Sequence, residues 1–426
     1  VISSALDIRD SAQGRGRLHE MIDQRGAASA VTSLAMRAYT PKDVRDGVAR
    51  AFANFASARP RPAYLEIPLD LLREPAGEGW EARGLPGRPS PSAAEINRAV
   101  ARLNAARRPL IILGGGALAA GAAAVTIAER LNAPIVTTTA GKGAVPAGHP
   151  LCLGYVMGRE ALWEMLRQSD AILCVGSELS ETDFWNDDVI ITRNLIRIDI
   201  DPSVMSRPHT ADIAILGDAR ETLEAIAPAI LARPGTGPAS FAAGDADPLR
   251  AMLARVLGVI REALPLDTVI CSDMTQIAYA ANEIFPVSVP RTWLHPVGFG
   301  TLGFALPAAI GARLGRPDTP VAVMIGDYGL QYTLNELGTA VEHQLPLVIL
   351  LWNNDALGQI RDDMVMKGIQ PNAVTLRNPD FQLLARAYGL RAERPENLRA
   401  LAAAIRAALA ADGPTLIEMT PRTVNG

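Results

Sequence analysis

The sequence predicts an α/β fold of three Rossmann-like domains, each a parallel sheet flanked by helices. Three observations support this fold class. A chain of 426 residues has room for about three domains at roughly 150 residues each. Short apolar runs alternate with helix-period stretches through most of the chain, which is the pattern of βα units. Two segments rich in proline and glycine, residues 75–92 and 233–248, lack both periods and are predicted to be linkers.

Composition and charge exclude several classes of protein. A net charge of −4 gives no electrostatic case for binding nucleic acid or an anionic membrane. The three cysteines lie far apart, without metal or redox spacing, which favours a reducing cytoplasm. Residues 296–312 form an uncharged stretch, but it is rich in glycine and shorter than the ~20 residues of a membrane-spanning helix.

The first segment, residues 1–74, is predicted to be the end of a domain. Thr40 and Pro41 precede a helix over residues 43–58, and a strand follows over residues 63–70. The chain begins with Val1 rather than methionine, in a strand-like stretch. We therefore expect the start of this domain to lie before Val1.

The second segment, residues 93–232, is predicted to be a complete α/β domain. Its strands are expected over residues 109–113, 133–137, 171–175 and 195–200. Gly114-Gly115-Gly116 follows the first of them and could approach a nucleotide, but it lacks the Gly-x-Gly-x-x-Gly frame. We favour a structural turn there.

The third segment, residues 249–426, carries the most specific motif. A strand over residues 321–326, a helix over residues 331–343 and a strand over residues 345–352 make a βαβ unit. Asp327 and Asn354 then follow two strands of one sheet at their carboxyl ends, where ligands of open α/β sheets collect.

These side chains suit a metal ion and a phosphate group. A carboxylate, an amide oxygen and a backbone carbonyl make part of the oxygen shell that Mg²⁺ prefers, and phosphate oxygens and water complete it. The helix that begins near Tyr328 and Gly329 can hold a phosphate at its first N–H groups. An Asp after a strand is also often only a helix N-cap, so this motif alone leaves both interpretations open.

The motif resembles that of the thiamine diphosphate (ThDP) enzymes, Gly-Asp-Gly followed after a spacer by Asn-Asn. It stands here as Gly326-Asp327-Tyr328 and Asn353-Asn354, with Tyr328 in place of the third-position glycine. Residues 297–312 resemble the segment that precedes Gly-Asp in acetolactate synthases and 2-oxo acid decarboxylases. The resemblance implies the ThDP-binding fold, with an incomplete first domain that binds the pyrimidine.

The resemblance also implies the residues that bind ThDP and Mg²⁺. A carbonyl at Gly300 accepts from the aminopyrimidine, and Leu302 holds the cofactor in its bent form. Thr275 and Gln276 stand where relatives bind the diphosphate, although an ordinary polar helix start explains them equally well. The magnesium ligands are Asp327, Asn354 and the carbonyl of Ala356. The full cofactor set is Thr275, Gln276, Gly300, Leu302, Gly326, Asp327, Tyr328, Gly329, Asn354, Leu357 and Gly358.

Two family features are missing from this sequence. The catalytic glutamate of the family has no match among Glu20, Glu66 and Glu74, so it is expected before Val1, and its identity is unknown here. Glu66 is interpreted as a strand residue or a surface charge. In the family this glutamate comes from a neighbouring subunit, which implies a homodimer or homotetramer. The stretch after residue 176 lacks the two arginines that acetolactate synthases place near FAD, so we expect no obligatory FAD.

The predicted function is ThDP- and Mg²⁺-dependent, non-oxidative decarboxylation of a small 2-oxo acid. The acyl carbanion left by CO₂ is stabilised by the thiazolium ring. The sequence looks most like the 5-guanidino-2-oxopentanoate decarboxylases. One alternative is an acetolactate synthase-like carboligase, and another is a non-catalytic ThDP-binding fragment. Asp362 and Asp363 could meet a cationic substrate tail, but solvated carboxylates are the more common case, and His295 is more often structural.

Overall fold

The computed structural model of the chain describes residues 1–78, 80–234 and 248–425. It divides into two compact units, of which unit 1 comprises Val1–Ser92, Ile200–Ser203 and Leu216–Asp218 and unit 2 comprises the remainder. Every helix within the described ranges is too short or too polar to cross a membrane. The predicted linker over residues 233–248 lies almost wholly outside these ranges, and the division into three domains stays a prediction.

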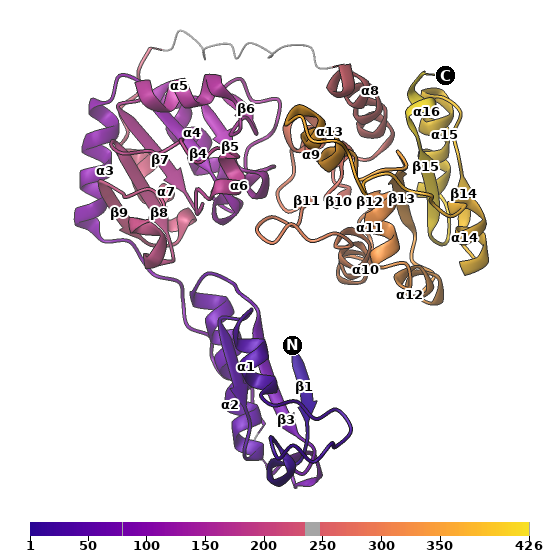
Figure 1. The fold of residues 1–426 in the computed structure, drawn as a ribbon. Helices are drawn as coiled ribbons and strands as arrows, with labels where there is room; N and C mark the ends of the chain where they lie inside the picture. Colours follow the sequence, from indigo (N-terminus) through magenta and orange to yellow (C-terminus); the bar gives the residue numbers. More distant parts are fainter. Residues whose placement is uncertain (79, 235–247, 426) are drawn as a thin grey trace. The chain divides into compact units, whose positions relative to one another are not determined.

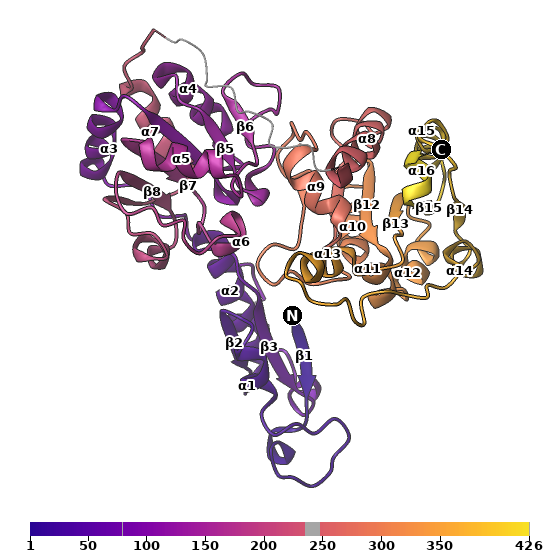
Figure 2. The same cartoon turned by 45° about the horizontal axis from the view of Figure 1, so that its top comes forward.

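Unit 1 is built on a three-stranded parallel sheet with the order β1-β3-β2. Figure 2 shows its strands beside α2. The helix predicted over residues 43–58 is α2, and it begins two residues earlier than expected. Thr40 and Asp43 form a capping box that fixes its first turn. The elements are β1 (Ile2–Ala5), α1 (Gln24–Ser29), β2 (Leu34–Arg37), α2 (Pro41–Ser57) and β3 (Ala63–Pro68).

The interpretation of Glu66 as a surface charge was wrong. Its side chain is 1% exposed, and one carboxylate oxygen lies 3.3 Å from Nη1 of Arg37 on the neighbouring strand β2. Burial raises the pKa of Glu66, and the guanidinium of Arg37 opposes that shift. Glu66 is therefore a strand residue held in a buried ion pair.

The first six-stranded sheet has the order β6-β5-β4-β7-β8-β9 (Figure 1). The chain moves outward from β4 through β5 to β6 and then crosses to β7 on the other side, so the switch point of the sheet lies between β4 and β7. The elements are α3 (Ala93–Ala105), β4 (Pro109–Leu113), α4 (Gly121–Leu131), β5 (Ile135–Thr137), β6 (Cys152–Gly154), α5 (Glu160–Gln168), β7 (Ala171–Val175), α6 (Glu181–Phe184), β8 (Leu195–Asp199), β9 (Ile213–Leu216) and α7 (Ala219–Ile226).

The second six-stranded sheet has the order β11-β10-β12-β13-β15-β14, with parallel pairing throughout (Figure 1). Its switch point lies between β10 and β12. The elements are α8 (Pro248–Ala263), β10 (Val269–Ser272), α9 (Gln276–Ile284), β11 (Trp293–Leu294), α10 (Ala305–Gly315), β12 (Val321–Gly326), α11 (Asp327–Tyr332), α12 (Glu336–Glu342), β13 (Leu347–Trp352), α13 (Gly358–Met366), α14 (Phe381–Tyr388), β14 (Arg391–Glu393), α15 (Leu398–Leu409), β15 (Thr415–Met419) and α16 (Pro421–Asn425).

Both faces of the second sheet are buried, as the continuous apolar strands predict. Alternate residues of each strand point to opposite faces: Val323 packs in the same core as α10, α12 and α14, whereas Met324 packs with α8, α9 and α15. The central strands β12 and β13 are buried along their whole length. The carboxyl ends of these strands therefore emerge from a rigid layered core.

The helix predicted over residues 331–343 is two shorter helices instead. The first, α11, begins directly after β12 with Gly326 as its N-cap. It ends at Thr333, whose φ of −131° lies outside the helical range. Tyr332 and Thr333 pack against Gly303, where an added Cβ would lie 3.0 Å and 2.9 Å from their side chains. This packing holds the chain at the break before α12.

Candidate functional site

The candidate site lies at the switch point of the second sheet. The segment after β10 leads to β11 on one side, and the segment after β12 leads to β13 on the other, so the two turns diverge and leave a crevice at the carboxyl ends. Gln276 begins α9 after the first turn, and Asp327 begins α11 after the second. Register pairs Gly326 with Trp352, which brings the end of β13 to the same edge.

Asp327 is held in one orientation by donors from three segments. Its Oδ1 accepts from the backbone N–H of Tyr328 at 2.9 Å, and its Oδ2 accepts from the side-chain amide of Asn378 at 2.8 Å. The backbone N–H of Ala356 also donates to this carboxylate. Burial of the 3% exposed side chain raises the pKa of Asp327, while these hydrogen bonds lower it. A bound cation would further favour the charged form.

The two asparagines after β13 have different surroundings. The amide of Asn353 donates to Oε1 of the buried Glu418 at 2.8 Å, so this residue is fixed to β15. The amide of Asn354 instead donates to Oε1 of Gln276 at 2.8 Å. Asn354 thus meets Gln276 at the start of α9, and its side-chain oxygen would be the atom that binds a metal there.

Thr275 and Gln276 approach the two glycines of the site closely. A Cβ on Gly326 would lie 2.8 Å from Oγ1 of Thr275, and a Cβ on Gly358 would lie 2.4 Å from Oε1 of Gln276. Thr275 is the N-cap of α9, but its hydroxyl makes no capping hydrogen bond. The hydroxyl and the first N–H groups of α9 are therefore donors suited to a phosphate.

The loop that carries Gly300 and Leu302 is fastened to the end of β10. The buried Asp273 accepts from the backbone N–H groups of Gly303 at 3.2 Å and Ala305 at 3.1 Å. Gly300 and Gly303 have φ angles of +61° and +84°, which favour glycine. The loop is therefore held in a defined shape beside the switch point.

The remaining predicted residues follow directly in the chain. Tyr328 and Gly329 form the first turn of α11, and a Cβ on Gly329 would lie 3.1 Å from Cγ of Asp273. Leu357 is the N-cap of α13, and its backbone N–H donates to the carbonyl of Val374 at 2.9 Å. Tyr328 is half-buried, and its backbone N–H rather than its side chain is committed to Asp327.

Sequence reasoning missed Asn378, Asp273 and Glu418. Asn378 bridges the site, because its amide also reaches Oδ1 of Asn353 at 2.9 Å. It lies 51 residues after Asp327 in a segment without regular structure, where no pattern indicates a role. Asp273 and Glu418 could have been noticed as single charges at the ends of apolar strands, since buried carboxylates need partners.

The donor set fits Mg²⁺ and a diphosphate. Asp327, Asn354 and Ala356 together offer a carboxylate, an amide oxygen and a backbone carbonyl, the oxygen ligands that Mg²⁺ prefers. Among the described residues no group of three or more His, Cys, Asp or Glu side chains could hold a metal ion. A set with only one carboxylate is consistent with that finding, because phosphate oxygens would provide the missing charge.

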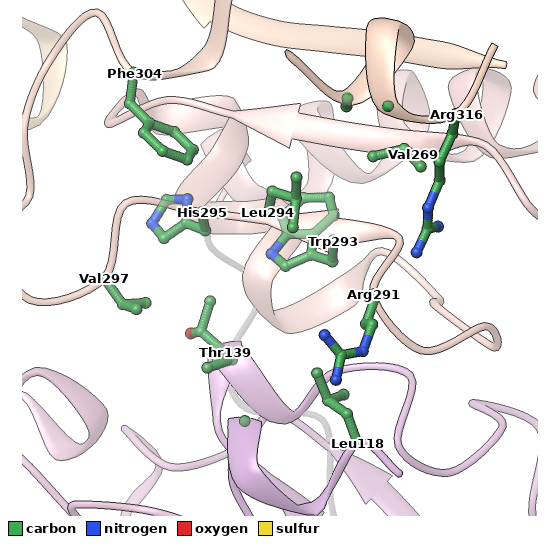
Figure 3. Close-up of a pocket in the computed structure, with 14 residues that line it drawn as sticks. Leu118, Thr139, Val269, Arg291, Trp293, Leu294, His295, Val297, Phe304 and Arg316 are labelled. Carbon is green, nitrogen blue, oxygen red and sulfur yellow. The ribbon is translucent and has the colours of Figure 1, made fainter. Parts of the chain in front are cut away.

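His295 lines a separate cavity of about 560 Å³, together with Trp293 and Phe304 (Figure 3). None of the predicted cofactor residues lines this cavity. Nδ1 of His295 lies 2.8 Å from Oγ of Ser272, and its Nε2 lies 3.3 Å from Nδ2 of Asn282. Burial lowers the pKa of His295 to about 4. A neutral ring with both nitrogens engaged fits the structural interpretation.

Comparison with known proteins places both sheets in one family. Residues 273–419 match the family model "Thiamine pyrophosphate enzyme, C-terminal TPP binding domain", and residues 96–226 match its central domain. A probable 2-ketoarginine decarboxylase of Pseudomonas aeruginosa is 45% identical, over 98% of this chain and 77% of the relative. Acetolactate synthase isozyme 3 large subunit of Escherichia coli is 29% identical, over 86% of this chain and 69% of the relative.

A solved structure shows the same fold. Benzoylformate decarboxylase from Polynucleobacter necessarius superimposes with a TM-score of 0.83 and 22% sequence identity. The match covers 98% of this chain and 81% of that chain. The predicted fold class, α/β with parallel sheets flanked by helices, is confirmed.

Proposed function

Because the chain is an enzyme of the thiamine diphosphate-dependent family of acetolactate synthases and 2-oxo acid decarboxylases, we propose that it decarboxylates 5-guanidino-2-oxopentanoate. The observation that carries this proposal is the 45% identity, over 98% of the chain, to a probable 2-ketoarginine decarboxylase. 2-Ketoarginine is another name for 5-guanidino-2-oxopentanoate. The acetolactate synthase of Escherichia coli is less similar, at 29% identity.

The described residues divide the work of holding the cofactor. Asp327, Asn354 and the carbonyl of Ala356 would bind Mg²⁺, and the start of α9 would bind the diphosphate with the hydroxyl of Thr275. ThDP, when bound, supplies the electron sink that a departing carboxylate requires. Gly300 and Leu302, on the loop held by Asp273, would position the other end of the cofactor.

The remaining members of the proposed set lie around these ligands. Tyr328 and Gly329 form the first turn of α11 and would lie beside phosphate oxygens, with the backbone N–H of Tyr328 already donating to Asp327. Leu357 is the N-cap of α13, and Gly358 is the first residue of that helix. A Cβ on Gly326 or on Gly358 would require the side chains of Thr275, or of Gln276 and Asn354, to move.

The carboxylate of Asp362 is committed within the protein rather than free for a substrate. It accepts from Nε2 of Gln276 at 2.7 Å and from Nε of Arg361 at 3.0 Å. Asp363 accepts from Nε2 of Gln359 at 2.9 Å. Each oxygen of Asp362 thus already accepts one hydrogen bond, and the substrate proposal depends on the similarity to the relative.

Oligomeric state and location complete the proposal. The resemblance implies that a neighbouring subunit contributes the catalytic glutamate, so we propose a homodimer or a homotetramer as the active form. The cytoplasmic location inferred from the scattered cysteines stays a prediction, as does the expectation that no FAD is required.

The test is a product assay on 2-oxo acids with guanidino, aliphatic and aromatic side chains. We expect CO₂ and 4-guanidinobutanal in equal amounts from the guanidino acid, with kcat/KM at least about 100-fold above that for pyruvate, since several specific contacts contribute. A carboligase would instead release CO₂ and a hydroxy-oxo acid. Highest activity on pyruvate, with acetolactate as the product, would overturn the proposal.

A further inference from the structure

Three polar side chains form a continuous hydrogen-bonded chain next to the proposed metal site. Asp362 of α13 accepts from Nε2 of Gln276 at 2.7 Å. Oε1 of the same Gln276 accepts from Nδ2 of Asn354 at 2.8 Å. Asp362 thus connects to a proposed magnesium ligand through a single amide.

The hydrogen bonds that join these three side chains can run in only one direction. An ionised carboxylate accepts hydrogen bonds and donates none, so Asp362 requires the NH₂ end of Gln276. The side-chain oxygen of Gln276 then faces Asn354, and the NH₂ group of Asn354 donates a hydrogen bond to it. Oδ1 of Asn354 is left pointing away from Gln276, free to bind a metal. Without Asp362, both amides could turn over and place an NH₂ group where a cation needs an oxygen.

Neighbouring residues hold these three hydrogen-bonded side chains in place. Gln276 is 6% exposed at the start of α9, and the absent side chain of Gly358 leaves room for the contact. A Cβ on Gly358 would lie 2.4 Å from Oε1 of Gln276 and 2.5 Å from Nδ2 of Asn354. Arg361 binds the other oxygen of Asp362, which keeps its carboxylate in position.

We propose that Asp362 is a positioning residue which, through Gln276, turns the amide oxygen of Asn354 toward the magnesium ion. This inference rests on the proposed function, which supplies the ion. It gives the side chain of Gln276 an orienting role and leaves its backbone N–H for the diphosphate. Asp362 itself touches neither cofactor nor substrate in this arrangement.

The first test compares two charge-neutralising variants of neighbouring residues in the full-length protein. Asp362→Asn can donate to Gln276 and so removes the fixed direction. We expect Mg²⁺, titrated calorimetrically in the presence of excess thiamine diphosphate, to bind about tenfold more weakly, the usual effect of losing a residue that orients a metal ligand. Asp363→Asn removes the same charge one position along α13 but contacts Gln359 instead. The Mg²⁺ affinity of the Asp363→Asn variant should change less than about twofold, because solvent and salt screen the charge of Asp363.

The second test reverses the direction of the hydrogen bond between Gln276 and residue 354. Asn354→Asp makes the metal ligand an acceptor only, so Gln276 must turn its NH₂ group to it and oppose Asp362 with its oxygen. In this background Asp362→Asn supplies the missing donor, and we expect it to strengthen Mg²⁺ binding several-fold. A change of sign between the two backgrounds is the signature of orientation, because a structural or purely electrostatic role would keep the same sign.

The outcomes separate this inference from the proposed site. Equal weakening by Asp362→Asn in both backgrounds, or no difference from Asp363→Asn, would overturn the positioning role while leaving the metal site intact. Asp327→Ala serves as the reference, because it removes the metal ligand itself. If Asp327→Ala also left Mg²⁺ binding unchanged, the proposed site would be wrong as well.

Discussion

The first six-stranded sheet and the second have equivalent switch points, one between β4 and β7 and the other between β10 and β12. In the first sheet the backbone itself fills the crevice: the N–H of Gly116 donates to the carbonyl of Gly176 at 3.0 Å, and a Cβ on Gly116 would lie 2.8 Å from the Cα of Gly176. In the second sheet the side chains of Gln276 and Asn354 are joined by a hydrogen bond there, and Asp327 begins α11 at the same edge. The same topology therefore carries the proposed site in one sheet and a close-packed turn in the other.

Substituting one carboxylate from each region tests this contrast with the largest expected effect. Asp327→Ala removes a proposed metal ligand, so Mg²⁺-dependent ThDP binding should weaken by at least about 100-fold. Asp183→Asn alters a half-buried carboxylate after β7, whose pKa is raised to about 6 by desolvation. It should cost about 1 kcal/mol of stability through its capping box and leave ThDP binding within about threefold. Calorimetry and urea unfolding measure both, and unchanged binding in Asp327→Ala would remove the metal assignment.

Glycine substitutions sharpen the same comparison. In Gly358→Ala the new Cβ meets only the ends of two side chains, those of Gln276 and Asn354, which can move aside. We expect Mg²⁺ affinity to fall about tenfold with little change in the free energy of unfolding. In Gly114→Ala the Cβ would lie 2.3 Å from the backbone oxygen of Gly176, which cannot move freely. That variant should lose about 3 kcal/mol of stability.

The two glycine variants are best compared by the ratio of their loss of Mg²⁺ affinity to their loss of stability. Calorimetric Mg²⁺ affinity and denaturant midpoints should separate them into a binding variant and a stability variant. Equal losses of stability with intact binding in both would mean that the two switch points do not differ in kind.

The sequence was sufficient for several inner strands of the sheets, among them β4, β7, β12 and β13, whereas β2, β6, β9, β11, β14 and β15 were not predicted. Residues 321–326 are apolar throughout and flanked by turn residues, so β12 and the position of Asp327 follow from local pattern alone. The Gly114 turn was also predicted as structural, and the close packing of Gly114 against Gly176 agrees with that interpretation without testing it. Local signals are strong where a strand is buried on both faces.

The orientation of the site side chains could not be predicted, because it depends on residues far apart in the sequence. Asn378 meets Asp327 across 51 residues, and Asp362 meets Gln276 across 86. Neither contact has a period or a spacing that a sequence displays. The break between α11 and α12 was missed for the same reason, since Gly303 packs against it from a distant loop. Glu66 was misjudged because its partner Arg37 lies on another strand.

The smallest expected effect concerns pH and two histidines, the buried His209 in the first sheet region and the half-buried His295 in the second. His209 lies in the first sheet region, where Nδ1 accepts from the backbone N–H of Ile191 at 3.1 Å. Burial and the nearby Arg197 lower its pKa to about 4, and burial alone lowers that of His295 to about 4. The unfolded chain takes up these protons near the ordinary value of 6.5. Stability is therefore fully present above pH 6.5 and is lost as the pH falls toward 4.

Each histidine should account for about 1–2 kcal/mol of the stability lost between pH 7 and pH 5. His295→Asn and His209→Asn keep a polar side chain that cannot titrate in this range, so each should flatten the pH dependence of the free energy of unfolding by that amount. Urea unfolding at several pH values measures this slope. A role for His295 in catalysis would make its variant lose turnover while His209→Asn keeps it. Similar kcat in both variants is expected, because Ser272 and Asn282 engage both ring nitrogens of His295 and none of the predicted cofactor residues lines its cavity.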